Sequence, residues 1–181
     1  NVQSLSYFKL IAGTEYLVSV CGAKIFKSDD LDGTMDDITG AVTITAGANN
    51  IWSFLTFNNI HIGFGGAATA PDAPLQWTGS GNAAALGGSP PSAYGAVQGN
   101  NRVFAFRTNA APSIVQWSIL GSGQDWTGAG SGSQNISTSD NDSITAMAVM
   151  DNSVALVFKQ NSVHKLMINT LVSAAFPVFS L

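Results

Sequence analysis

The chain has 181 residues, which suffices for one sizeable core but would be cramped for two unrelated domains. Only 10% of the residues are charged and 45% are hydrophobic, whereas soluble domains typically carry roughly 25% charged residues. The 11 acidic and 7 basic residues give a net charge of −4, with too few Lys and Arg for a phosphate-tracking surface. The composition argues against electrostatic nucleic-acid binding and favours a surface sheltered by neighbours in a large assembly.

Cys21 is the one cysteine of the sequence, which excludes an intrachain disulfide framework and a Cys-rich zinc site. We expect it to be a small buried residue. No apolar run approaches the roughly 18 residues of a membrane helix, so no membrane span is expected. The N-terminus lacks the layout of a signal peptide, and because the chain begins with Asn1 we expect a processed chain or a piece of a longer one.

Short apolar runs with strand character recur along the chain, whereas helical periodicity is almost absent. Four pairs of such runs predict antiparallel hairpins: 7–11 with 16–20, 51–57 with 60–64, 93–98 with 103–106, and 144–150 with 154–158. Their turns are expected at Gly13-Thr14, Asn58-Asn59, Asn100-Asn101 and Asp151-Asn152. Asn and Asp suit such turns because they tolerate positive φ angles.

Each hairpin is followed by a third apolar run, at 23–27, 75–77, 114–118 and 162–168. A fourth, weaker strand is expected at 41–45, 83–86, 134–137 and 175–179. The turns begin at residues 13, 58, 100 and 151, so they lie 45, 42 and 51 residues apart. This spacing is close to the roughly 40 to 50 residues of a four-stranded propeller blade.

The sequence therefore predicts an all-β fold, a β-propeller with about four blades in this chain, or an arc of a larger propeller. The chain would form a single repeat domain over 1–181, with approximate blades at 1–46, 47–88, 89–138 and 139–181. A β-sandwich or a solenoid of hairpins is the alternative fold.

A glycine-rich run at 63–68 has the letters of a dinucleotide-binding fingerprint. Such a turn must open a helix, but Pro71 and Pro74 follow promptly and no amphipathic helix appears. A strand-to-strand connection is favoured there, and no cofactor is expected.

An acidic run at 29–37 could supply oxygen ligands for calcium. It departs from the EF-hand pattern, because Gly33 comes too early and no Glu closes the loop. A solvated turn is favoured, as it is for the second acidic group of Asp140, Asp142 and Asp151.

Hydrolytic chemistry has no recognisable sequence signature in this chain. There is no nucleophile elbow, and His61 and His164 fall in strands of different blades. His61 alternates with two isoleucines, which predicts a polar surface position. We expect no catalytic and no metal-binding residue, although carboxylates distant in sequence could still converge as in a glycosidase.

The four tryptophans, at 52, 77, 117 and 126, could stack against sugars, but core packing is favoured. Trp77 and Trp117 each follow a Gln at the end of a third strand, so equivalent blade positions are expected for them. Asn135 and Asn141 begin glycan-acceptor motifs that would matter only in a eukaryotic secretory setting.

The third and fourth units resemble the blades of bacteriophage tail propellers, a group that includes tail-nozzle, tail-hub and head-to-tail connector proteins. The resemblance is clearest over 93–168, where an Asn-Asn turn is followed by Trp-Ser at 117–118 and Asp-Trp at 125–126. The stretch 118–126 is also similar to the Asp-box turn of sialidase-like propellers, but Leu120 stands where the Asp should be, so sialidase chemistry is not implied.

The resemblance implies a structural virion protein in the tail or connector, localised in the virion and contributing to the conduit for DNA ejection. Its partners would be other tail subunits, including copies of itself in a ring. One alternative is a glycan- or receptor-binding propeller that uses loop residues such as Asp125 and Trp126. A second alternative is a glycosidase-like propeller enzyme.

Overall fold

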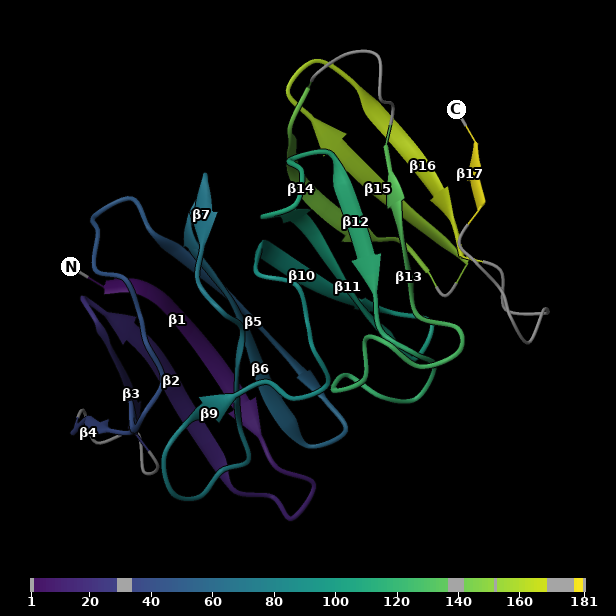
Figure 1. The fold of residues 1–181 in the computed structure, drawn as a ribbon. Helices are drawn as coiled ribbons and strands as arrows, with labels where there is room; N and C mark the ends of the chain where they lie inside the picture. Colours follow the sequence, from purple (N-terminus) through teal and green to yellow (C-terminus); the bar gives the residue numbers. More distant parts are fainter. Residues whose placement is uncertain (1, 29–33, 137–141, 152, 169–177, 181) are drawn as a thin grey trace.

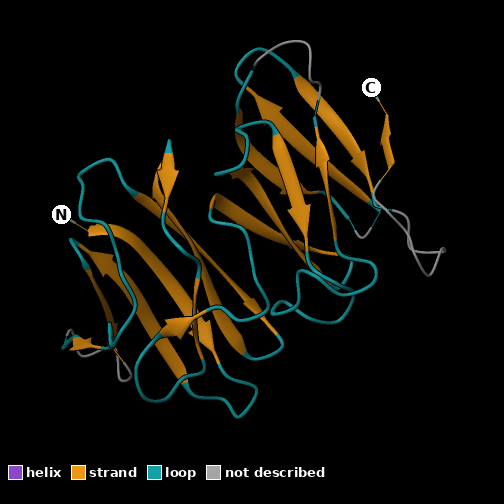
Figure 2. Ribbon diagram, in the orientation of Figure 1, coloured by secondary structure: helices purple, strands orange, loops and turns teal. Residues whose placement is uncertain are grey.

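The computed structural model describes residues 2–28, 34–136, 142–151, 153–168 and 178–180. Within these ranges the regular elements are all β-strands, and no helix occurs (Figure 2). The chain is therefore all-β, as the sequence predicts.

The strands form four antiparallel sheets that follow one another along the chain (Figure 1). Sheet 1 contains β1 (Val2–Lys9), β2 (Glu15–Cys21), β3 (Lys24–Ser28) and β4 (Asp36–Asp37). Sheet 2 contains β5 (Ile51–Phe57), β6 (Ile60–Ala67), β8 (Leu75–Trp77) and β9 (Ala84–Ala85), with β7 (Ala70–Pro71) paired to β6. Sheet 3 contains β10 (Ala93–Gly99), β11 (Arg102–Thr108), β12 (Ile114–Trp117) and β13 (Gly132–Asn135). Sheet 4 contains β14 (Ile144–Val149), β15 (Val154–Lys159), β16 (Val163–Met167) and β17 (Val178–Ser180).

All four predicted hairpins are present. The first turn is longer than predicted, because β1 ends at Lys9 and the residues Leu10 and Ile11, predicted in the strand, belong to the turn that also contains Gly13 and Thr14. Asn58 and Asn59 have φ angles of 48° and 66°, and Asn100 and Asn101 have 45° and 54°. Two successive positive φ angles define the tight turn that matches the twist of paired strands. In the last hairpin the Asp151 Oδ1 accepts hydrogen bonds from the amides of Ser153 and Val154, whereas Asn152 lies outside the described residues.

The third strands are also confirmed, but the first of the fourth strands was predicted in the wrong place. It is β4 at Asp36–Asp37, and the stretch 41–45 is a loop. This loop resembles a strand in sequence because its apolar side chains enter the core, where Ile44 is only 5% exposed. Of the stretch predicted at 175–179, residues 175–177 lie outside the described residues and β17 begins at Val178.

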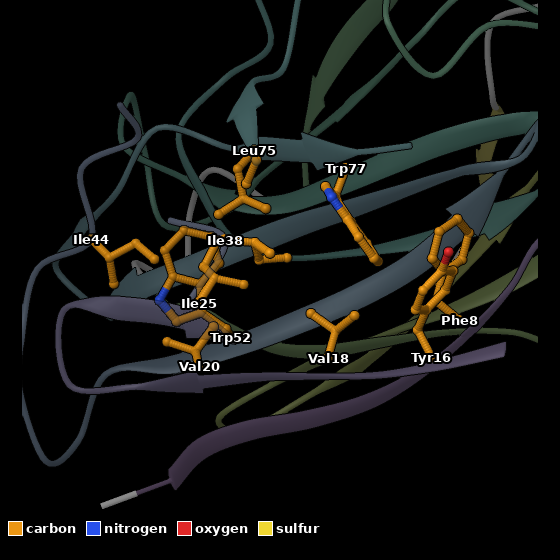
Figure 3. Packing of buried hydrophobic residues seen from close by; sticks show 11 residues of the cluster. Phe8, Tyr16, Val18, Val20, Ile25, Ile38, Ile44, Trp52, Leu75 and Trp77 are labelled. Atoms are coloured by element: carbon orange, nitrogen blue, oxygen red, sulfur yellow. The ribbon is translucent and has the colours of Figure 1, made fainter. Parts of the chain in front are cut away.

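The sheets stack face to face in chain order, and one apolar cluster fills each of the three spaces between them. The cluster between sheets 1 and 2 includes Phe8, Tyr16, Trp52 and Trp77 (Figure 3). A second cluster joins sheets 2 and 3, and a third joins sheets 3 and 4. The first strands of successive sheets contact one another, β1 with β5, β5 with β10, and β10 with β14.

Trp77 and Trp117 are both buried at the end of a third strand, but they point to opposite faces of their sheets. Trp77 pairs with His61, the second residue of β6, and belongs to the cluster facing sheet 1. Trp117 pairs with Phe104, the third residue of β11, and belongs to the cluster facing sheet 4. A register difference of one residue reverses the face of a strand, so the predicted equivalence holds for strand position and fails for packing.

Candidate functional site

His61 lies in the contact between sheets 1 and 2, although the sequence predicted a surface position. Its ring is 1% exposed and stacks between Phe8 and Phe54, with centroid distances of 4.8 and 4.9 Å. Its Nε2 lies 2.8 Å from the Ser6 Oγ, and its Nδ1 lies 3.4 Å from the Thr56 Oγ1. The prediction was wrong because the opposite face of β6 is covered by sheet 1, which alternation within one strand cannot reveal.

The Ser6–His61 pair has the spacing of a nucleophile and base, but its surroundings do not support that chemistry. Burial lowers the pKa of His61 to about 4, so the imidazole is neutral and a weak base at pH 7. Its second nitrogen faces the Thr56 hydroxyl and not a carboxylate that would stabilise an imidazolium. We therefore interpret the pair as a polar contact between two sheets.

His164 lies on β16 in sheet 4, where its Nε2 is 3.0 Å from the Ser162 Oγ. Sheet 3 lies between this sheet and sheet 2, which carries His61, so the fold does not bring the two histidines together (Figure 1). No group of three or more His, Cys, Asp or Glu side chains that could hold a metal ion is found among the described residues.

The acidic residues that the structure describes hold turns and edge strands. Asp36 and Asp37 form β4, where Asp37 accepts from the Lys24 Nζ and the Thr39 hydroxyl; these hydrogen bonds keep the pKa of Asp37 below its usual range. Asp142 is buried and accepts from the amides of Gln160 and Asn161. Residues 29–33 and Asp140 of the predicted acidic groups lie outside the described residues.

The glycine-rich run belongs mainly to strand β6 and opens no helix. A side chain at Gly63 would lie 2.6 Å from the Phe54 ring, and one at Gly65 would overlap the backbone of Ile51. These glycines therefore let the large side chains of β5 pack across the strand. The predicted strand-to-strand connection is limited to the turn after Ala67.

The loop at 118–131, which joins β12 to β13, is firmly attached to sheet 2. Trp126 is 3% exposed, meets the Phe64 ring edge-on at 5.9 Å, and donates from its Nε1 to the Gly123 carbonyl at 3.0 Å. The Asp125 Oδ1 accepts from the amides of Thr127 and Gly128. In this conformation Trp126 offers no ring face for sugar stacking. Asp125 and Trp126, the two residues suggested for glycan binding, therefore both stabilise the loop.

Buried Arg102 holds the same loop from the side of sheet 3. Its Nη1 donates to the carbonyls of Ser118 and Gly130, at 2.8 and 2.5 Å. Burial lowers the pKa of this guanidinium from its ordinary value. The strand pattern of the sequence does not indicate that Arg102 holds this loop, because its partners are backbone carbonyls 16 and 28 residues away.

A surface hollow of about 470 Å³ lies between the 41–43 loop, residues 72–74 and residues 83–85. Its lining is mainly alanine, valine and proline, with the Asp72 carboxylate as its charged group. This carboxylate accepts from the Thr45 amide at 2.8 Å and from the Thr45 hydroxyl at 2.6 Å. The hollow therefore has few polar groups that could recognise a ligand.

The two ends of the stack expose apolar sheet faces. In sheet 1 the side chains that point away from sheet 2 include Leu5, Tyr7, Leu17, Cys21 and Phe26, which we call the sheet 1 end face. In sheet 4 the side chains that point away from sheet 3 include Ala146, Ala148, Leu156, Phe158 and Val163, which we call the sheet 4 end face, with the exposed Lys165 opposite Leu156 as its charged group. Cys21 is thus half-buried on an end face, and not buried in the core as predicted. These faces are the best candidates for functional surfaces.

A scan against protein-family models finds no match for this chain, and a search of the curated proteins finds none either. Among the described residues no helix is long and apolar enough to cross a membrane. The class that the observations define is thus an all-β protein of four stacked antiparallel sheets.

Proposed function

We propose that the four sheets are blades of a β-propeller and that the chain is a structural, non-catalytic subunit of a tailed bacteriophage, in the tail or the head-to-tail connector. The observation that carries the proposal is the succession of antiparallel sheets in which strands one to four follow the chain order. In a propeller each blade is such a meander, and neighbouring blades share an apolar interface.

The order of the contacts supports blades around an axis more than a sandwich. The first strands β1, β5, β10 and β14 approach one another in series, whereas the short fourth strands form no comparable series. Blades that radiate from an axis converge at their innermost strands and diverge at their outermost ones. A sandwich would instead pair two sheets in opposed layers.

Four described polar side chains of types that could do chemistry are engaged in holding the sheets and loops. His61 joins sheets 1 and 2, Arg102 and Asp125 fix the 118–131 loop, and Asp142 holds the turn after β15. The low charge of the chain fits a surface covered by neighbouring subunits. These features support scaffolding, with copies of the chain and other tail subunits as partners.

The phage setting rests on the motifs of the third and fourth units, with the Asn-Asn turn at 100–101 and the Trp-Ser and Asp-Trp pairs. The test is mass spectrometry of tailed particles purified through two density gradients. Peptides of this chain should be found in intact particles at a fixed ratio to the other tail proteins. An abundant non-structural protein of the same lysate is the control, and absence of this chain from intact particles would overturn the proposal.

A further inference from the structure

The three contacts within the stack repeat one relation. In each of them the face of one sheet that points forward along the chain order meets the rear face of the next sheet. Phe8, Tyr16 and Val18 of sheet 1 face Trp52 and the other apolar side chains of sheet 2, and the same order recurs at the two later contacts. Each internal sheet thus has both faces covered.

Each of the two end faces lacks the neighbouring sheet that covers the corresponding face of an internal sheet. The sheet 1 end face is a rear face without a preceding sheet, and the sheet 4 end face is a forward face without a following one. Leu5 and Tyr7 are 64% and 53% exposed on the first, and Val163 is 58% exposed on the second. Contiguous exposed apolar side chains of this kind mark interaction surfaces.

We propose that a second copy of this chain docks its sheet 1 end face onto the sheet 4 end face of the first, so that copies associate head to tail. The inference rests on the proposed scaffold and names its partner and the two surfaces involved. The contact continues the internal series β1–β5, β5–β10 and β10–β14, with β1 of the second copy lying over β14 of the first. Such a contact is heterologous, and it closes into a ring when the rotation between copies permits.

A second copy fits because it presents the same rear face, with β1 as its first strand, that each internal contact uses. Sheets 1 and 4 lie at opposite ends of the stack, so the two faces of one copy do not cover each other (Figure 1). The apolar part of the sheet 1 end face is bordered at the hairpin turn by the Lys9–Glu15 ion pair, at 2.7 Å. An apolar centre with a polar border is the usual arrangement of a protein interface.

The first experiment measures the mass of the 181-residue chain in solution by sedimentation and light scattering. A closed or growing assembly of at least two copies is expected, against 18.7 kDa for one copy. Two variants each disable one face: Leu5→Lys, and Ala146→Lys combined with Val163→Lys. Either change alone should reduce the assembly to single copies, because every head-to-tail contact uses both faces. The matched control is Leu120→Lys, an exposed apolar residue of the 118–131 loop that lies on neither end face.

The second experiment mixes the two disabled variants in equal amounts. Each retains one intact face, so a complex of two copies that cannot grow further is the expected product. A symmetric contact between like faces would give no such complex, and circular dichroism with a thermal melt verifies that both variants are folded. A wild-type chain that stays monomeric at about 100 µM, or folded variants that fail to combine, would overturn the inference. The particle assay is independent, because a chain found in virions can still lack this contact and a self-associating chain can still be absent from them.

Discussion

Trp126 provides the sharpest test of whether the 118–131 loop is part of the core or a binding platform. The side chain is 3% exposed, and it packs with Phe64, Phe57 and Leu86 in the cluster between sheets 2 and 3. Replacing a buried aromatic residue by alanine costs about 3–5 kcal/mol, because apolar contacts are lost and a cavity remains. Trp126→Ala also removes the hydrogen bond to the Gly123 carbonyl. We expect the free energy of unfolding to fall by about 3–5 kcal/mol.

The assay is urea denaturation followed by circular dichroism, with Leu120→Ala in the same loop as the matched control. Leu120 is 57% exposed, so its truncation should change the free energy of unfolding by no more than about 0.5 kcal/mol. The loss of unfolding free energy for Trp126→Phe should fall between those for Trp126→Ala and Leu120→Ala, because the ring contact with Phe64 is largely kept and the Nε1 donor is lost. A loss below about 1 kcal/mol for Trp126→Ala, close to that of the control, would refute the assignment of Trp126 to the core.

Three further perturbations test other contacts of the stack. Gly88→Ala should lower the free energy of unfolding by at least about 2 kcal/mol in the urea denaturation assay. The reason is that Gly88 has a φ of +77° and that an added Cβ would overlap the Gln124 carbonyl. Gly87→Ala is the neutral control, because a Cβ at Gly87 meets nothing within 4 Å. For His61, the folded pKa of about 4 lies below the ordinary 6.5, so the unfolded chain binds the extra proton and the protein loses stability as the pH falls from 6.5 towards 4. This loss reaches about 3 kcal/mol, and a pH series of melts on His61→Phe should lack it; an identical pH dependence in wild type and variant would contradict the assignment. Arg102→Met should cost about 2 kcal/mol or more, because the carbonyls of Ser118 and Gly130 lose a charged donor. Urea denaturation checks this, and an unchanged midpoint would show that the loop does not depend on Arg102.

The hairpins could be predicted from the sequence because their determinants are local. Asn58-Asn59 and Asn100-Asn101 supply the two positive φ angles of a tight turn, and the apolar runs beside them have strand length. The third strands follow at short distance, so their pairing is nearly imposed by the connection. Local sequence features are therefore sufficient to predict the individual sheets.

Packing between sheets could not be predicted, because it depends on residues far apart in the sequence. His61 appears polar within β6, yet sheet 1 brings Ser6, 55 residues earlier in the chain, and Phe8 over it. The face of Trp77 depends on a one-residue register that the sequence letters do not record. The 41–45 loop has the alternation of a strand because Ile44 enters the core, while the actual edge strand at Asp36–Asp37 is held by Lys24 and Lys27.

Electron cryomicroscopy of the purified assembly tests the propeller arrangement most directly. We expect sheets arranged around an axis, with β1, β5, β10 and β14 nearest to it and sheet 4 of one copy facing sheet 1 of the next. Strand order and ring symmetry are visible at modest resolution, before side chains are resolved. Sheets in two opposed layers, a straight solenoid of hairpins, or first strands on the outer rim would contradict this expectation.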